Sequence, residues 1–323
     1  MLSVMPFPNT SFFRNRNEAL LQECEGTLEY RIYIDYVIDS FSKVPVNKMK
    51  PQIREILRSG VYQLKFMDSV PDSAVCNEAV KLAQRKGFYN LKPFVNGVLR
   101  TIARELKNLE LPPREENEVR YLSVKYSMPE YLVNKWITAY GVKTTEKILE
   151  DFLTERPLTV RCRTHKASKK AIVTSLRSQG VTVEQAPYLP YALKISDYNH
   201  ILTLDAFLQG QILVQDVSSM MVAEVASPKK GDYIIDMCAA PGGKSIHAAD
   251  KMGDYGNVEA RDVSQYKADL IEENIQRTGV INVESKVQDA TIYDPDSEEK
   301  ADIVIADVPC SGYGVIGKKP EIK

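Results

Sequence analysis

Hydrophobic side chains recur at helical spacing through the first half of the chain, from about Glu29 to Leu153. Apolar residues three and four positions apart place one face of a helix against a core. The pattern predicts a helix through 54–65, a second one before Gly87, a third around 94–102 and a last amphipathic one around 131–140. The residues expected in the first three cores are Ile53, Ile56, Leu57, Tyr62, Leu64, Val75, Ala79, Val80, Leu82, Phe94, Val95, Val98, Leu99 and Ile102.

The expected ends of these helices come from capping and breaking residues. Asp72 or Ser73 is expected to cap the second helix, because short polar side chains accept hydrogen bonds from free N–H groups. Gly141 is expected to end the last helix as its C′ residue. Between them, Pro112-Pro113 breaks the helical pattern and predicts a linker.

After Pro157 the pattern changes to short β-branched runs that alternate with helices. Strands at 158–163, 181–183, 192–195 and 212–216, with a helix at 167–179, predict a small α/β module. After a helix at 218–226, strands at 233–236, 258–262, 284–287 and 303–307 predict a parallel sheet. The run 303–307 is nearly continuously apolar, which is typical of a strand buried on both faces. We therefore expect a multidomain chain: all-α, then a small α/β module, then a Rossmann-like α/β domain.

The composition of the chain excludes several classes of protein. The 323 residues are 44% hydrophobic and 26% charged, as in an ordinary soluble protein, and no apolar run approaches the ~20 residues of a membrane span. The opening residues 1–16 do not resemble a signal peptide. Five scattered cysteines without a CxxC spacing support neither disulfides nor a zinc site. The sequence predicts a cytoplasmic protein without a metal.

The net charge of −1 hides a basic run between Arg156 and Val183 that contains no acid. Such a run is either a solvated face or a surface for the phosphates of a nucleic acid, since Lys and Arg supply most sequence-independent affinity. The candidate RNA-binding residues in it are Arg161, Arg163, Lys166, Lys169 and Lys170.

The strand at 233–236 ends in Asp236 and leads into a turn of small residues and a helix. This is the strand–glycine turn–helix opening of a nucleotide-binding unit, in which bare backbone can approach a ligand. Gly243-Lys244-Ser245 is similar to the end of a phosphate-binding P-loop, but Cys238 stands where that motif has glycine, and Pro241 lacks an N–H donor. The turn therefore favours a ligand without a polyphosphate, such as S-adenosylmethionine.

Acidic residues follow four successive strands of the predicted sheet: Asp236, Asp262, Asp289 and Asp307. Because the carboxyl ends of parallel strands share one edge, we expect these side chains to line a ligand site. Asp262 lies about 20 residues beyond the turn, where an acid accepts hydrogen bonds from ribose hydroxyls.

Asp307-Val308-Pro309-Cys310 is the second candidate for chemistry. Carbon 5 of cytosine is a poor nucleophile until a group adds to carbon 6, and a thiolate is suited to adding there and leaving afterwards. Cys310, in a loop three residues after Asp307, has suitable placement. The alternative is a cysteine that acts only as a small hydrophobic residue.

These residues carry a family resemblance. The segments 236–244 and 307–312 resemble the RNA 5-methylcytosine methyltransferases, and 58–104, with Val70–Val75 and Phe94–Arg100, resembles a NusB-type helical RNA-binding domain. Their fusion is typical of the bacterial Sun/Fmu-type 16S ribosomal RNA methyltransferases. The implied domains are 1–112 NusB-like, 113–157 a helical linker, 158–227 a small RNA-binding module and 228–323 the class I methyltransferase domain.

The resemblance implies methyl transfer from S-adenosylmethionine to carbon 5 of a cytosine in 16S ribosomal RNA, at position 967, by a protein that acts as a monomer. It implies that the cofactor contacts Cys238, Ala239, Ala240, Pro241, Gly242, Gly243, Lys244, Asp262, Asp289 and Asp307, with Asp262 at its ribose and Asp289 at its adenine end. Asp307 would lie between cofactor and cytosine.

Two departures from the family pattern stand beside this resemblance. In the RNA enzymes the attacking cysteine lies in a later Thr-Cys motif and the Pro-Cys cysteine assists product release, whereas no residue here matches the later motif. The opening NusB-type helices and the last strands of the sheet are also not matched, so we expect a chain truncated at both ends. Three hypotheses follow: an active methyltransferase, in which Cys310 releases product or itself attacks; an RNA- and cofactor-binding remnant without turnover; and, less favoured, a P-loop nucleotide hydrolase.

Overall fold

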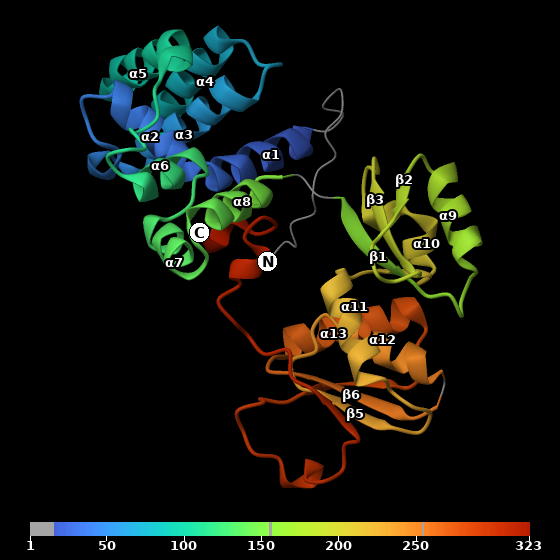
Figure 1. Cartoon of the computed structure of the whole chain (residues 1–323). Helices are drawn as coiled ribbons and strands as arrows, with labels where there is room; N and C mark the ends of the chain where they lie inside the picture. The colour runs from blue at the N-terminus through green and yellow to red at the C-terminus, as the bar shows by residue number, and fades with distance from the viewer. Residues whose placement is uncertain (1–15, 155–156, 254) are drawn as a thin grey trace. The chain divides into compact units, whose positions relative to one another are not determined.

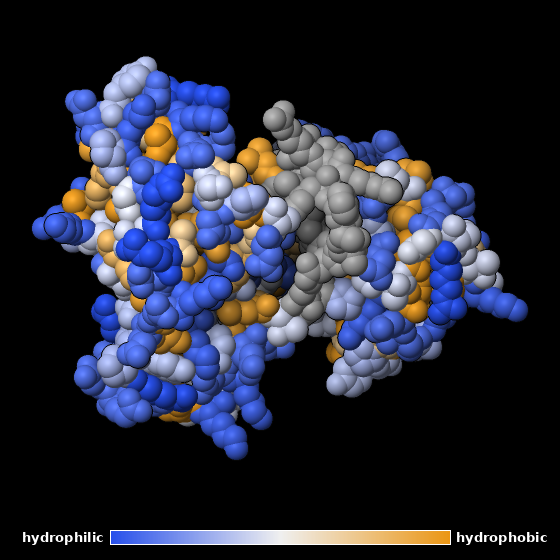
Figure 2. Space-filling model, turned by 90° about the horizontal axis from the view of Figure 1, so that it is seen from above, coloured by the Kyte–Doolittle hydropathy of each residue, from blue (hydrophilic) through white to orange (hydrophobic). Residues whose placement is uncertain are grey.

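A computed structural model describes residues 16–154, 157–253 and 255–323 (Figure 1). The first fifteen residues, where we expected no signal peptide, lie outside the described part. Two compact units are present: one contains 16–154 together with 312–323, and the other contains 157–311. No described helix is both long and apolar enough to cross a membrane. Figure 2 shows hydrophilic residues interspersed with smaller hydrophobic areas on the face seen there.

The first unit is helical. Its helices are α1 (Arg16–Glu29), α2 (Arg31–Phe41), α3 (Pro51–Phe66), α4 (Asp72–Arg85), α5 (Lys92–Glu105), α6 (Glu118–Lys125), α7 (Glu130–Tyr140) and α8 (Val142–Phe152). The predicted helical spacing is confirmed at the core of α2–α5, where Ile53, Leu57 and Leu99 are almost fully buried. Burying such side chains contributes about 1.5–3 kcal/mol each to folding.

Three details of the helical prediction were wrong. The residue before α4 is Pro71, so Asp72 opens the helix instead of capping it. Leu82 is 39% exposed because it lies on the outer face of α4. Gly141 does end α7, at a φ of 75°, but it also begins α8, a helix that the sequence pattern did not separate.

A second core in this unit joins α6–α8 to the end of the chain. Ile316 is fully buried against a cluster that includes Leu122, Met128 and Leu132. The segment 312–323 therefore packs on the helices, directly after the loop that carries Cys310 in sequence.

The second unit begins with the small α/β module. Its elements are β1 (Leu158–Cys162), α9 (Lys169–Ser178), β2 (Thr182–Gln185), β3 (Ala192–Ser196), α10 (Asp205–Leu208) and β4 (Ile212–Val214). The strands form an antiparallel sheet in the order β2-β3-β1-β4. In this register Arg161 lies opposite Ala192 on one side and Leu213 on the other, at the centre of the sheet.

The parallel sheet follows α11 (Val217–Ala226). Its elements are β5 (Tyr233–Asp236), α12 (Gly243–Met252), β6 (Asn257–Asp262), α13 (Gln265–Thr278), β7 (Val283–Val287) and β8 (Ile303–Ile305). The strand order is β7-β6-β5-β8, with all pairs parallel, which confirms the Rossmann-like prediction. Helices α11, α12 and α13 lie on one face of the sheet (Figure 1). The order reverses between β5 and β8, and such a switch point is where open α/β sheets bind ligands.

Strand β8 differs from its prediction. It is shorter than 303–307 and lies at the edge of the described sheet, where it pairs only with β5. Its side chains alternate between the two faces, so that Ile303 and Ile305 pack against the core under the helices, whereas Val304 points to the other face and is 56% exposed. A continuously apolar run therefore did not mean burial on both faces here.

Candidate functional site: the small-residue turn and the Asp307 loop

The turn after β5 is held by the neighbouring strands. The Met237 N–H donates to the carbonyl of Ile305 at 2.9 Å, and the Ala239 N–H donates to the carbonyl of Arg261 at 2.8 Å. The turn is thereby attached to the strands on both sides of β5. The small side chains of Ala239, which is buried, and Ala240, which is half-buried, let the turn pack closely between these strands.

Gly242 turns the chain into α12. Its φ is 97°, in the left-handed region, and a Cβ there would meet Ile271 at 3.4 Å. Glycine is therefore required by conformation, with close packing as a second reason. Because α12 begins at Gly243, the N–H groups of its first turn lie beside the small-residue turn.

Asp236 lies beneath this turn and is completely buried. Ser245 donates its hydroxyl to Asp236 Oδ2 at 2.7 Å. Burial raises the pKa of Asp236 to about 6, against the opposing effects of the Ser245 hydrogen bond and the Lys244 charge. Asp236 thus supports the turn from inside, and Ser245 is a supporting residue that sequence reasoning missed.

Asp262, at the end of β6, accepts hydrogen bonds from three donors. They are the Ala240 N–H at 3.1 Å, the Val263 N–H at 2.8 Å and Lys267 Nζ at 2.9 Å. Burial favours the neutral acid, but the hydrogen bonds from Lys267, Val263 and Ala240 outweigh it and lower the pKa of this carboxyl. Asp262 is therefore an anion fixed against the turn, covered by the flexible, partly exposed Lys267.

Lys244 joins the turn to the next loop. Its Nζ lies 2.5 Å from Asp307 Oδ2, across the switch point between β5 and β8. The Asp307 side chain is 60% exposed, so it can reach a substrate. Cys310 is exposed in the same loop.

Two predicted site residues have different surroundings. The Cys238 thiol lies in the turn, where burial and the charge of Asp262 raise its pKa and keep it protonated. Asp289 follows β7 and accepts from the backbone and hydroxyl of Thr291, which lower its pKa. The structure therefore connects the turn, Asp262 and Asp307 through direct contacts, whereas the Asp289 carboxylate accepts hydrogen bonds from Thr291.

Arg161 and Arg163 correct the predicted RNA-binding set. They are only 2% and 1% exposed, and both bind Asp250 of α12. A buried, ion-paired guanidinium cannot contact RNA phosphates without dismantling the fold. Their spacing of two residues on a strand was a signal for a shared face, but the partner acid lies nearly 90 residues away in sequence.

The three lysines of that set have different exposures. Lys166 and Lys170 are exposed, whereas Lys169 is partly covered and donates to the carbonyl of Pro190 at 2.6 Å. Lys166 and Lys170 thus remain the exposed residues of the candidate RNA-binding set.

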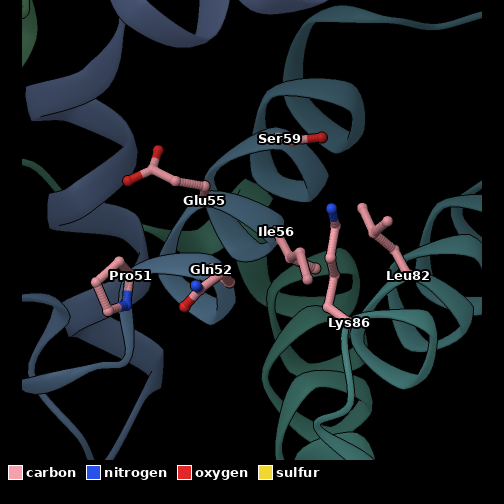
Figure 3. A pocket seen from close by; sticks show the side chains of 7 residues that line it. All are labelled: Pro51, Gln52, Glu55, Ile56, Ser59, Leu82 and Lys86. Carbon is pink, nitrogen blue, oxygen red and sulfur yellow. The ribbon is translucent and has the colours of Figure 1, made fainter.

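A separate hollow of about 370 Å³ lies in the helical unit, between α3 and the end of α4 (Figure 3). Figure 3 shows Ile56 and Gln52 on the α3 side and Leu82 and Lys86 on the α4 side. Its lining is mainly apolar and shares no residue with the turn. We therefore place the candidate site at the functional groups of the turn and not at this hollow.

Comparisons with known proteins agree with this geometry. Residues 9–104 match the NusB family, 128–201 the ferredoxin-like domain of RsmF/B-like methyltransferases, and 223–323 the 16S rRNA methyltransferase RsmB/F family. The probable ribosomal RNA small subunit methyltransferase B of Bacillus subtilis is 36% identical over 96% of this chain and 69% of its own length. Its counterpart in Synechocystis is 30% identical over 92% of this chain and 67% of its own length. The crystal structure of PH0851 matches with a TM-score of 0.79 at 28% identity, over 96% of this chain and 70% of that one.

Proposed function

Because this chain belongs to the RsmB/F family of 16S ribosomal RNA methyltransferases, we propose that it transfers a methyl group from S-adenosylmethionine to carbon 5 of a cytosine in that RNA. The proposed target is the cytosine at position 967. The enzyme would act as a monomer in the cytoplasm, where its RNA is made.

One observation carries the proposal: the Lys244–Asp307 pair joins the small-residue turn to the Cys310 loop at the switch point of the sheet. The turn fits a sulfonium cofactor because its residues from Cys238 to Gly243 are small and uncharged, and because Cys238 stands where a P-loop has glycine. S-adenosylmethionine, when bound, supplies an electrophilic methyl group.

The residues proposed to hold the cofactor are those of the turn, the first residue pair of α12 and three strand-end acids. They are Cys238, Ala239, Ala240, Pro241, Gly242, Gly243, Lys244, Asp262, Asp289 and Asp307. In this proposal Asp262 accepts hydrogen bonds from the ribose hydroxyls. This requires the partly exposed Lys267 side chain to move aside. Asp289 lies toward the adenine end.

Asp307 and Cys310 are assigned to the cytosine. The Asp307 carboxyl hydrogen-bonds the pyrimidine edge, which favours thiolate addition to carbon 6 and makes carbon 5 nucleophilic. After methylation, loss of the proton on carbon 5 restores the ring double bond and expels the thiolate. We assign Cys310 to this release step, and to the attack itself if the chain turns over without a second cysteine.

RNA lacking the modification and tritium-labelled S-adenosylmethionine test the proposal. Wild type should transfer label to the RNA. If a second thiol attacks carbon 6 and Cys310 releases product, Cys310→Ala should accumulate a covalent RNA–protein complex on a denaturing gel. If Cys310 itself attacks, the variant should form neither complex nor product. Binding of RNA and cofactor without any transfer would instead support the second hypothesis, a binding protein without turnover.

A further inference from the structure

The buried charges between the small module and α12 are not used by the proposed chemistry. Arg163 binds Asp250 in a bidentate manner, with Nη2 2.6 Å from Oδ1 and Nε 2.9 Å from Oδ2. Arg161 adds a third contact, from Nη1 to Oδ2 at 2.6 Å. Charge-assisted bidentate hydrogen bonds of this geometry are among the strongest and most specific in proteins. Here they fix a strand of the module to the last turn of α12.

Arg161 also approaches the first residue of α12 through a neighbouring side chain. Arg161 donates from Nε to Gln215 Oε1 at 2.9 Å. The Cδ of Gln215 lies 4.0 Å from the position that a Cβ would take at Gly243. Arg161 therefore binds the last turn of α12 directly at Asp250 and holds a side chain beside the first residue of that helix.

Other contacts hold the helices that flank α12. Arg163 Nη1 donates to the carbonyls of Gly210, at 3.1 Å, and Thr278, at 2.5 Å, which ties the end of α13 to the module. Tyr191 of the module hydrogen-bonds Glu224 of α11, and Glu224 binds Lys251 of α12 at 2.9 Å. The module thus contacts α11, α12 and α13, all three helices on that face of the sheet.

We infer that Arg161 and Arg163 are positioning residues for the cofactor site, so that the small module is a structural part of that site as well as a candidate RNA-binding surface. A helix is rigid along its axis, and α12 begins directly after the turn. Fixing its last turn at Asp250 therefore also fixes the N–H groups of its first turn, where a displacement of about 1 Å can cost about a hundredfold in function. The inference depends on the proposed function for the identity of the cofactor.

Arg161→Lys is the variant that tests the positioning role most selectively. It keeps the charge and leaves the bidentate Arg163–Asp250 pair intact, but one ammonium does not reproduce the planar fork that contacts Asp250 and Gln215. Asp250→Asn is the second variant, which removes the charge at nearly constant shape. The matched control is Asp35→Asn, which weakens the bidentate Arg58–Asp35 pair of the helical unit (2.6 and 2.7 Å) without touching α12.

Two measurements on the full chain decide the matter. Amide hydrogen exchange without cofactor should become about tenfold faster at Ile246–Ala248 in Arg161→Lys and Asp250→Asn and stay unchanged there in Asp35→Asn. Calorimetric titration of S-adenosylmethionine should show a Kd about tenfold weaker in the first two variants than in wild type. Both are made well below each variant's melting temperature.

If exchange at 246–248 and cofactor affinity both match wild type in Arg161→Lys, the inference is overturned, even when the melting temperature falls. Should Asp250→Asn fail to fold, Arg161→Lys alone decides. Failure of wild type to bind S-adenosylmethionine would refute the proposed function, while the exchange measurement would still test the positioning role.

Discussion

Lys244 Nζ and Asp307 Oδ2 lie 2.5 Å apart and connect the first turn of α12 with the loop after β8. Lys244 directly follows the glycines of the turn, and Asp307 precedes Cys310 by three residues. One ion pair therefore links the side of the site assigned to the cofactor with the side assigned to the base. Lys244 is largely covered and Asp307 is largely open, so the pair presents the carboxylate outward.

Replacing Lys244 with Met should lower methyl transfer about a hundredfold, because Asp307 loses the partner that orients it toward the base. Cofactor affinity should fall much less. The control is Lys81→Met, which removes the Lys81–Glu78 ion pair (2.7 Å) on α4 of the helical unit. Single-turnover rates with labelled S-adenosylmethionine measure the effect, and equal rates in the two variants would contradict the role of the pair.

Gly242→Ala should abolish most cofactor binding. The residue has a φ of 97°, so alanine is strained there and its Cβ also meets Ile271. Gly231→Ala is the matched control, because Gly231 has a φ of 95° and open space around it. Both changes should cost about 1 kcal/mol of stability, but only Gly242→Ala should weaken the Kd for S-adenosylmethionine, by at least about tenfold. A similar loss of affinity in both variants would refute the assignment of the turn.

The raised pKa of Asp236 predicts how the stability of the folded chain depends on pH. Because burial raises its folded-state pKa from 3.8 to about 6, the folded chain binds the proton more tightly than the unfolded chain. Its contribution to stability is fully present below about pH 4 and is lost as the pH rises through about 6. Asp236→Asn cannot ionise, so its stability relative to wild type should rise across that window by up to about 3 kcal/mol.

Melting temperatures of wild type and Asp236→Asn between pH 4.5 and 8 test this dependence. The difference between the two proteins should grow with pH and level off above about 7. A difference that is constant over the whole range would show that Asp236 has an ordinary pKa in the folded protein.

Lys166 and Lys170 are exposed residues of the candidate RNA-binding set. If they contact RNA phosphates, alanine at both should weaken binding to any sequence and reduce the slope of log affinity against log salt by about 1–2. The control is Lys300→Ala, which replaces an exposed lysine that lies among acidic residues, between Glu299 and Asp302. Fluorescence anisotropy with a 16S RNA fragment at several salt concentrations measures the slope, and an unchanged slope in the double variant would remove these lysines from the interface.

The sequence predicted the acidic residues at the edge of the parallel sheet better than it predicted the RNA-binding residues of the small module. Asp236, Asp262 and Asp307 could be placed together because parallel strands end at one edge, whatever their separation in sequence. Arg161 and Arg163 were read as a phosphate-binding surface because nothing local to residues 156–183 reveals Asp250. Val304 was predicted to be buried because an apolar run does not tell whether both faces of the sheet are covered.

Titration of S-adenosylmethionine into the purified chain, beside magnesium–ATP, tests the central claim most directly. The account predicts saturable heat with S-adenosylmethionine, loss of that heat in Gly242→Ala, and no specific binding of ATP. Absence of heat with S-adenosylmethionine together with a clear isotherm for ATP that Lys244→Ala abolishes would contradict it and restore the P-loop alternative.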